Sequence, residues 1–110
     1  MLIFKITDGK GFQITFANGV TLSTQFGQYN YCENYILKKG LGSDLTRAFG
    51  KENHCPNCES KDVEIAIWKG RNDEWLTREC PHCEVDDDVM GYVNIDTWFK
   101  IVEWCKDYKG

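Results

Sequence analysis

Two short cysteine motifs are the residues of this chain most able to do chemistry. Cys55-Pro56-Asn57-Cys58 and Cys80-Pro81-His82-Cys83 are C-P-x-C turns, separated by 21 residues. Proline fixes the backbone of such a turn and removes one amide hydrogen. The remaining amides can point at the thiolates and stabilise their charge. Because zinc prefers four ligands in a tetrahedron, the two motifs predict one structural zinc ion held by Cys55, Cys58, Cys80 and Cys83.

The residues between the motifs form a hairpin pattern. Val63, Ile65 and Ile67 alternate with other residues, Gly70-Arg71-Asn72-Asp73 is a turn sequence, and residues 74–79 form the return strand. A hairpin of this length places its two ends side by side, where the cysteines lie. Spacing, turn and strand pattern therefore predict a zinc ribbon over residues 51–83.

Other cysteine chemistries are weaker alternatives. Disulfides need an oxidising compartment, and the chain shows no secretion signal. A redox C-x-x-C motif opens a long helix, whereas EVDDDVMGYV follows Cys83. Iron could occupy the same sulfur cage, since both metals accept four thiolates. His54 and His82 flank the ligands without being needed, and Cys32 and Cys105 are interpreted as small buried apolar residues.

Composition and charge limit the possible functions. The 110 residues carry a formal net charge of −4, which four thiolates and one zinc ion would move to about −6. Such a chain is poorly suited to salt-driven binding of phosphate backbones. It has no apolar stretch long enough to cross a membrane. These features predict a cytoplasmic protein.

The elements outside the ribbon predict an α+β fold in a single domain, residues 1–110. Phe12, Ile14 and Phe16 alternate with polar residues, and Asn18-Gly19 predicts a type I′ hairpin turn. A short helix is expected from Ser43 or Asp44 to Phe49, and residues 90–93 read as a strand. Asn94 or Asp96 then caps a C-terminal helix. Its apolar stripe is predicted to pack on the antiparallel sheet, with the stripe formed by Ile95, Trp98, Val102 and Cys105, flanked by Phe99 and Ile101.

Three segments are candidate binding surfaces. Residues 26–35 combine tyrosine, asparagine and glycine, which make adaptable contacts, and the residues selected there are Tyr29, Asn30, Tyr31 and Asn34. The ribbon mixes aromatic and basic groups at Trp68, Lys69 and Arg71, as nucleic-acid surfaces do, but its acidic residues outnumber its basic ones. Residues 84–88 form an acidic loop, which is usually solvated. The sequence shows no Ser-His-Asp grouping, phosphate loop or catalytic metal motif, so we expect no enzyme activity.

Three stretches of the chain carry a family resemblance. The segments KGFQITFANGVTLSTQFGQYNYCENY, VEIAIW with its EW partner, and DDDVMGYVNIDTW resemble a group of small phage-encoded proteins of uncharacterised role. Many members of that group lack the C-P-x-C motifs, so the zinc ribbon is a departure from its pattern. The resemblance implies a phage or prophage accessory protein that acts inside a bacterial host.

Together, the residues and the resemblance predict a non-enzymatic protein that engages a host protein. Two alternatives remain: a ribbon that binds nucleic acid, and capture of a small nucleotide-like signal by the tyrosine-rich segment.

Overall fold

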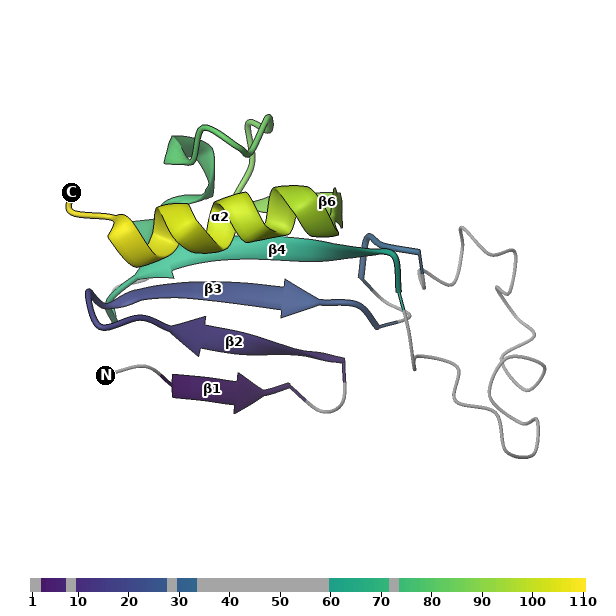
Figure 1. Ribbon diagram of the computed structural model, residues 1–110, viewed down its shortest axis with the longest axis horizontal. Coiled ribbons are helices and arrows are strands. Elements are labelled where there is room, and N and C mark those ends of the chain that lie inside the picture. Colours follow the sequence, from purple (N-terminus) through teal and green to yellow (C-terminus); the bar gives the residue numbers. More distant parts are fainter. Residues whose placement is uncertain (1–2, 8–9, 28–29, 34–59, 72–73) are drawn as a thin grey trace.

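The computed structural model describes residues 3–7, 10–27, 30–33, 60–71 and 74–110. These residues form one antiparallel sheet of six strands and one C-terminal helix (Figure 1). The α+β prediction is therefore confirmed. The first cysteine motif, with Cys55 and Cys58, lies outside the described residues, as do His54 and the helix expected to end at Phe49.

The first three strands form an antiparallel meander: β1 (Ile3–Ile6), β2 (Gly11–Thr15) and β3 (Val20–Gln25). The predicted type I′ turn between β2 and β3 is wrong. The Phe16 amide donates to the Val20 carbonyl, which leaves three residues in the loop, and only Gly19 has a positive φ, at 88°. The Gly19 amide donates back to the Phe16 carbonyl at 2.9 Å. This is the three-residue loop in which an ordinary turn ends on a left-handed glycine.

Strand β4 (Asp62–Lys69) lies inside the sheet and pairs with β3 along one edge. Its other edge is shared by two strands: β5 (Glu74–Trp75) pairs with its last two residues, and β6 (Val89–Asn94) pairs with its first half. The return strand predicted for residues 74–79 is therefore shorter than expected. It ends at Trp75, and the 3-10 helix η1 (Thr77–Glu79) follows.

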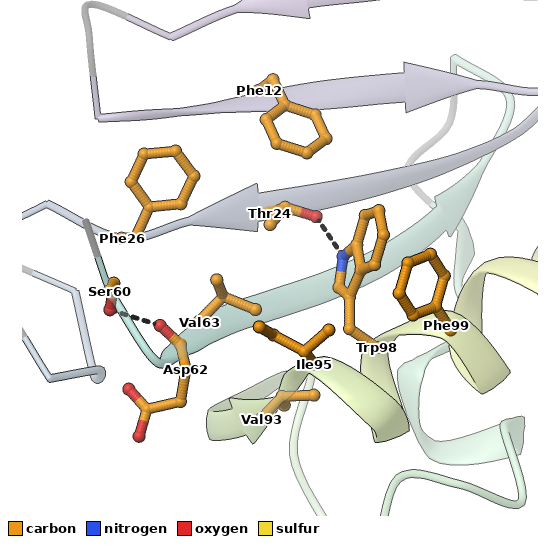
Figure 2. A pocket seen from close by; sticks show the side chains of 10 residues that line it. All are labelled: Phe12, Thr24, Phe26, Ser60, Asp62, Val63, Val93, Ile95, Trp98 and Phe99. Atoms are coloured by element: carbon orange, nitrogen blue, oxygen red, sulfur yellow. Dashed lines mark hydrogen bonds between the residues drawn. The ribbon is translucent and has the colours of Figure 1, made fainter. Parts of the chain in front are cut away.

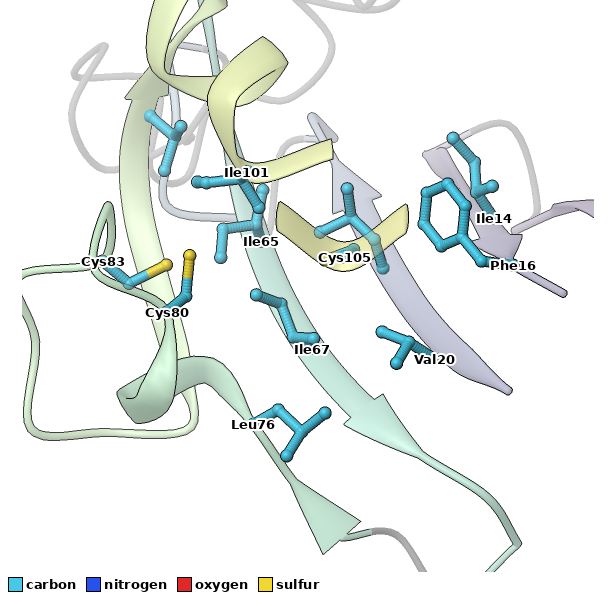
Figure 3. Close-up of a cluster of buried hydrophobic side chains, with 12 residues drawn as sticks. Ile14, Phe16, Val20, Ile65, Ile67, Leu76, Cys80, Cys83, Ile101 and Cys105 are labelled. Carbon is cyan, nitrogen blue, oxygen red and sulfur yellow. The ribbon is translucent and has the colours of Figure 1, made fainter. Parts of the chain in front are cut away.

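Helix α2 (Ile95–Asp107) packs on one face of the sheet, against β3, β4 and β6. Of the two predicted caps, Asn94 and Asp96, the structure has Asn94, whose side-chain oxygen accepts from the Thr97 amide at 2.9 Å. Ile101 and Cys105 are fully buried in the core (Figure 3). The predicted apolar stripe is too broad, since Ile95 is 57% and Phe99 61% exposed. The stripe is wider than the sheet area that the helix covers, so these two side chains face solvent.

The β2–β3 loop holds the other end of this helix. The Asn18 amide nitrogen donates to the carbonyls of Cys105 and Tyr108, both at 2.9 Å. The Asn18 oxygen accepts from the Val20 amide at 3.0 Å within the loop. One side chain therefore closes the hairpin turn and supplies an extra donor to carbonyls at the end of the helix, where backbone donors become scarce. No helix among the residues described is long and apolar enough to cross a membrane.

Candidate functional site

The second cysteine motif forms a compact turn inside the hydrophobic core. Cys80 is 1% and Cys83 7% exposed, and the Cys83 amide donates to the Cys80 carbonyl at 3.0 Å. Figure 3 shows the two sulfur atoms turned toward one another beside Ile65. Both cysteines carry free thiols. The turn therefore presents two unoxidised sulfur atoms from one side, as a metal-binding C-x-x-C turn does.

Thr77 directs the chain from the sheet into this turn. The Leu76 amide still donates to the Ile67 carbonyl, but the Ile67 amide donates to the Thr77 hydroxyl oxygen at 2.9 Å. The same hydroxyl donates to the Asp88 carbonyl at 2.6 Å. The buried Thr77 side chain thus replaces the backbone hydrogen bonds between strands at the point where β5 ends. It also connects the start of the segment that carries the cysteines, at Thr77, with its end at Asp88. Because the chain leaves the sheet here, the edge of the first half of β4 remains available for pairing with β6.

Hydrogen bonding gives the two thiols different acidities. The Cys80 pKa lies below its usual value, first because Cys83 hydrogen-bonds to its sulfur and then because the His82 and Cys83 amides do so as well. The Cys83 pKa is raised by its bond to Cys80 and by burial. Amides directed at a thiolate are the arrangement that the sequence predicted, and they stabilise a sulfur that carries negative charge.

Cys105 lies in the same core but in a different setting. It is fully buried on α2, and burial raises its pKa to about 12. A thiol with that pKa stays protonated at neutral pH. Cys32 is also fully buried, and its thiol donates to the Gly27 carbonyl at 3.6 Å; neither Cys32 nor Cys105 forms a disulfide among the residues described. The interpretation of Cys32 and Cys105 as small buried residues is confirmed.

The residues present fit half of the predicted zinc site. Cys80 and Cys83 supply two sulfur donors with supporting amides, and zinc accepts such donors readily. The other two predicted ligands, Cys55 and Cys58, lie outside the described residues. Within the described ranges, no group of three or more histidine, cysteine or acidic side chains comes together. The four-cysteine zinc site therefore stays a prediction.

The described part of the tyrosine-rich segment is tied to the sheet. The Asn30 side-chain oxygen accepts from the Gly27 amide, and its nitrogen donates to Glu64 at 3.0 Å. The Tyr31 amide also donates to Glu64, and the Tyr31 carbonyl accepts from the Tyr92 amide. Asn30 thus orders the loop, while the Tyr31 side chain is 51% exposed. Tyr29 and Asn34 lie outside the described residues, so this binding surface stays a prediction.

The aromatic and basic residues of the ribbon lie at the far end of β4. The Trp68 and Trp75 rings meet edge to face, with centroids 5.6 Å apart. The Lys69 ammonium lies 5.6 Å from the Tyr108 ring centroid, while Arg71 is exposed. Lys69 therefore has a partner within the chain, and Arg71 is the cation of this set that is most available to a ligand.

Arg78 pairs with the acidic loop. Its guanidinium donates to the Asp88 carboxylate at 3.0 Å and lies 4.0 Å from Asp86. The bond to Asp88 is the main reason why the Arg78 pKa is raised. The loop thus neutralises a nearby cation and anchors the segment after Cys83.

An apolar groove beside α2 is a feature that the sequence analysis missed. It encloses about 400 Å³ between the helix and the sheet, and Figure 2 shows its aromatic walls. The Trp98 indole donates to the Thr24 hydroxyl at 2.8 Å, so the ring is fixed in the groove wall. The Asp62 carboxylate points away from the rings (Figure 2). The apolar lining comprises Phe12, Phe26, Val63, Val93, Ile95, Trp98 and Phe99.

The signal for the groove was present in the sequence. The apolar stripe of the C-terminal helix spans more residues than one buried face needs, and the excess lines the groove. Comparison with family models, with curated proteins and with solved structures finds no match to this chain. The phage resemblance therefore stays a prediction.

Proposed function

We propose that this chain is a non-enzymatic, phage-type accessory protein that binds a protein of the bacterial host. In this proposal one structural zinc ion, held by Cys55, Cys58, Cys80 and Cys83, fixes residues 51–83. The observation that carries the binding role is the groove beside α2. Its volume is in the range of sites that accept a small ligand or the anchoring side chains of a protein partner.

The groove supports a protein partner for two reasons. Its mouth is formed by Ile95 and Phe99, which stay exposed at the start of α2. Aromatic and large aliphatic side chains in such a position are typical of binding hot spots, which receive one or two apolar anchors of the partner. The net charge of −4 favours a partner whose surrounding surface is basic.

A pull-down from bacterial lysate tests the binding role. Phe99→Ser removes an exposed ring at the groove mouth and leaves the buried face of α2 intact. Val89→Thr removes an exposed apolar side chain on β6 and is the matched control. We expect the wild type and Val89→Thr to capture the same host protein and Phe99→Ser to lose most of it. Equal capture by all three proteins would show that the groove is not the binding surface.

Elemental analysis tests the metal. Protein purified under reducing conditions should contain about one zinc ion per chain, because four thiolates close one tetrahedral site. Cys80→Ser should lose the metal, whereas Cys105→Ala should keep it. Zinc-free wild-type protein, or zinc retained in Cys80→Ser, would remove this part of the proposal.

Direct nucleic-acid binding is the alternative that the exposed Arg71 and the half-exposed Trp75 favour. Phosphate-driven affinity falls steeply as salt rises. Fluorescence anisotropy with labelled DNA and RNA at low salt separates the two functions. Affinity that collapses with salt and with Arg71→Gln would support the alternative over the host-protein role.

A further inference from the structure

Among the strands that the structure describes, β1 lies at the edge of the sheet, and it carries exposed apolar side chains. Figure 1 shows β1 as the strand farthest from α2. Phe4 is 68% and Ile6 79% exposed. Ile6 lies opposite Phe12 in the register, and the Phe12 ring contacts Trp98 of α2, so the Phe4 and Ile6 side chains both lie on the helix side of the sheet.

The outward hydrogen-bonding groups of β1 belong to the same two residues. The Thr7 amide donates to the Gly11 carbonyl across β1 and β2 at 3.0 Å. Because these bonds alternate along an antiparallel pair, Lys5 and Ile3 also face β2. The amides and carbonyls of Phe4 and Ile6 therefore point away from the sheet. Among the strands that the structure describes, β2 alone pairs with β1.

We propose that a second copy of this chain pairs with β1 along this edge in antiparallel orientation. Phe4 of one copy lies opposite Ile6 of the other, and the two-fold axis passes beside Lys5. In each Phe4–Ile6 pair the amide of each residue then donates to the carbonyl of the other. The apolar side chains of both copies meet on one face of the sheet. A two-fold axis perpendicular to the sheet places the same residues of β1 from both copies in contact, as an isologous interface requires.

Self-pairing also explains how an apolar edge can be tolerated. An unpaired, exposed and apolar edge strand is a site of uncontrolled aggregation, and one closed pairing removes it. The contact involves four residues of each strand, so its area falls in the range of weak and transient interfaces. The dimer should therefore form reversibly as the protein concentration rises.

Lys5 gives the pairing a register that can be tested. Its side chain points to the face opposite Phe4 and Ile6, where it meets Lys5 of the second copy. Like charges directly opposite one another weaken a strand pair, and opposite charges strengthen it. A mixture of wild type and Lys5→Glu should therefore form a mixed dimer about two- to tenfold tighter than either pure dimer.

Sedimentation velocity on the full chain over a wide concentration range tests the dimer. We expect the wild type and Val89→Thr to shift from one chain mass to two. Ile6→Pro should stay monomeric, because proline removes an outward amide that β2 does not use. Loss of near-UV circular dichroism would identify a misfolded variant. A wild type that stays monomeric throughout, or that grows beyond two chains, overturns the proposal.

Amide hydrogen exchange on the wild type keeps the proposal testable without any variant. Exchange at Phe4 and Ile6 should slow as concentration rises, while exchange at Lys5 should not change. Unchanged exchange at Phe4 and Ile6, or a mixed dimer with Lys5→Glu no tighter than the pure ones, contradicts the pairing. Neither result affects the zinc content or the capture of a host protein, so the two proposals can fail separately.

Discussion

Asn18 offers a sharp test of how the sheet and the helix are held together. Its nitrogen donates to the Cys105 and Tyr108 carbonyls at the end of α2, and its oxygen accepts from the Val20 amide. Asn18→Ala removes these three bonds and a longer one of 3.3 Å to the Lys106 carbonyl. Each is worth about 0.5–1.5 kcal/mol net, and the freed carbonyls can partly reach water, so we expect a loss of about 2 kcal/mol in the free energy of unfolding.

A second substitution separates the two roles of this side chain. Asn18→Asp keeps an oxygen that can accept from Val20 but loses the donor to the helix. It also places a carboxylate against the negative end of the helix dipole, which costs about 0.3–1 kcal/mol. We therefore expect Asp to be at least as destabilising as Ala, although it preserves the turn.

Urea denaturation followed by far-UV circular dichroism measures both variants against the wild type. The midpoint and slope of the unfolding transition give the free energy of unfolding for each protein. A loss below about 0.5 kcal/mol for Asn18→Ala, or wild-type stability of Asn18→Asp, would refute the reasoning. Either result would mean that the helix end is held by other contacts.

Three further substitutions test the parts around the candidate site. Thr77→Val leaves the Ile67 amide and the Asp88 carbonyl without their partner, so the free energy of unfolding in urea should fall by about 2–3 kcal/mol. An unchanged free energy of unfolding would refute the role of Thr77 in joining these segments. Gly91→Ala places a Cβ 2.6 Å from the Tyr31 Cβ, and should cost about 1–3 kcal/mol; a wild-type midpoint would show that the loop moves freely. Removal of zinc with a chelator should lower the melting temperature of the wild type but not that of Cys80→Ser. Equal shifts in the melting temperatures of the two proteins would show that the metal does not stabilise the fold.

The sequence was sufficient where one local rule decided the structure. Alternating apolar residues predicted β2 and β4, and Asn94 was one of the two residues predicted to cap the helix. Asn18-Gly19 correctly marked a turn but not its type. The turn type follows from the pairing of Phe16 with Val20, which leaves three residues in the loop. That register depends on the pairing of all strands in the sheet.

The remaining differences come from competition between segments distant in sequence. Residues 76–79 suit a strand, but β6 takes the edge of β4 that they would need. The choice depends on packing that involves Val93 and Thr77, which no local pattern reports. The groove was predictable only in part: the broad apolar helix face was visible in the sequence, but how much of it the sheet covers depends on the packing of distant segments.

The burial of Cys80 and Cys83 changes what a zinc ion would do in this protein. A ribbon added to the outside of a domain can lose its metal while the domain stays folded. Here both sulfur atoms lie in the core that contains Ile101, Leu76 and Ile65. Two thiolates left there without a cation would have to bind protons, since an isolated buried charge is too costly. Loss of the metal should therefore be coupled to protonation of these two thiols and should lower the stability of the core around them.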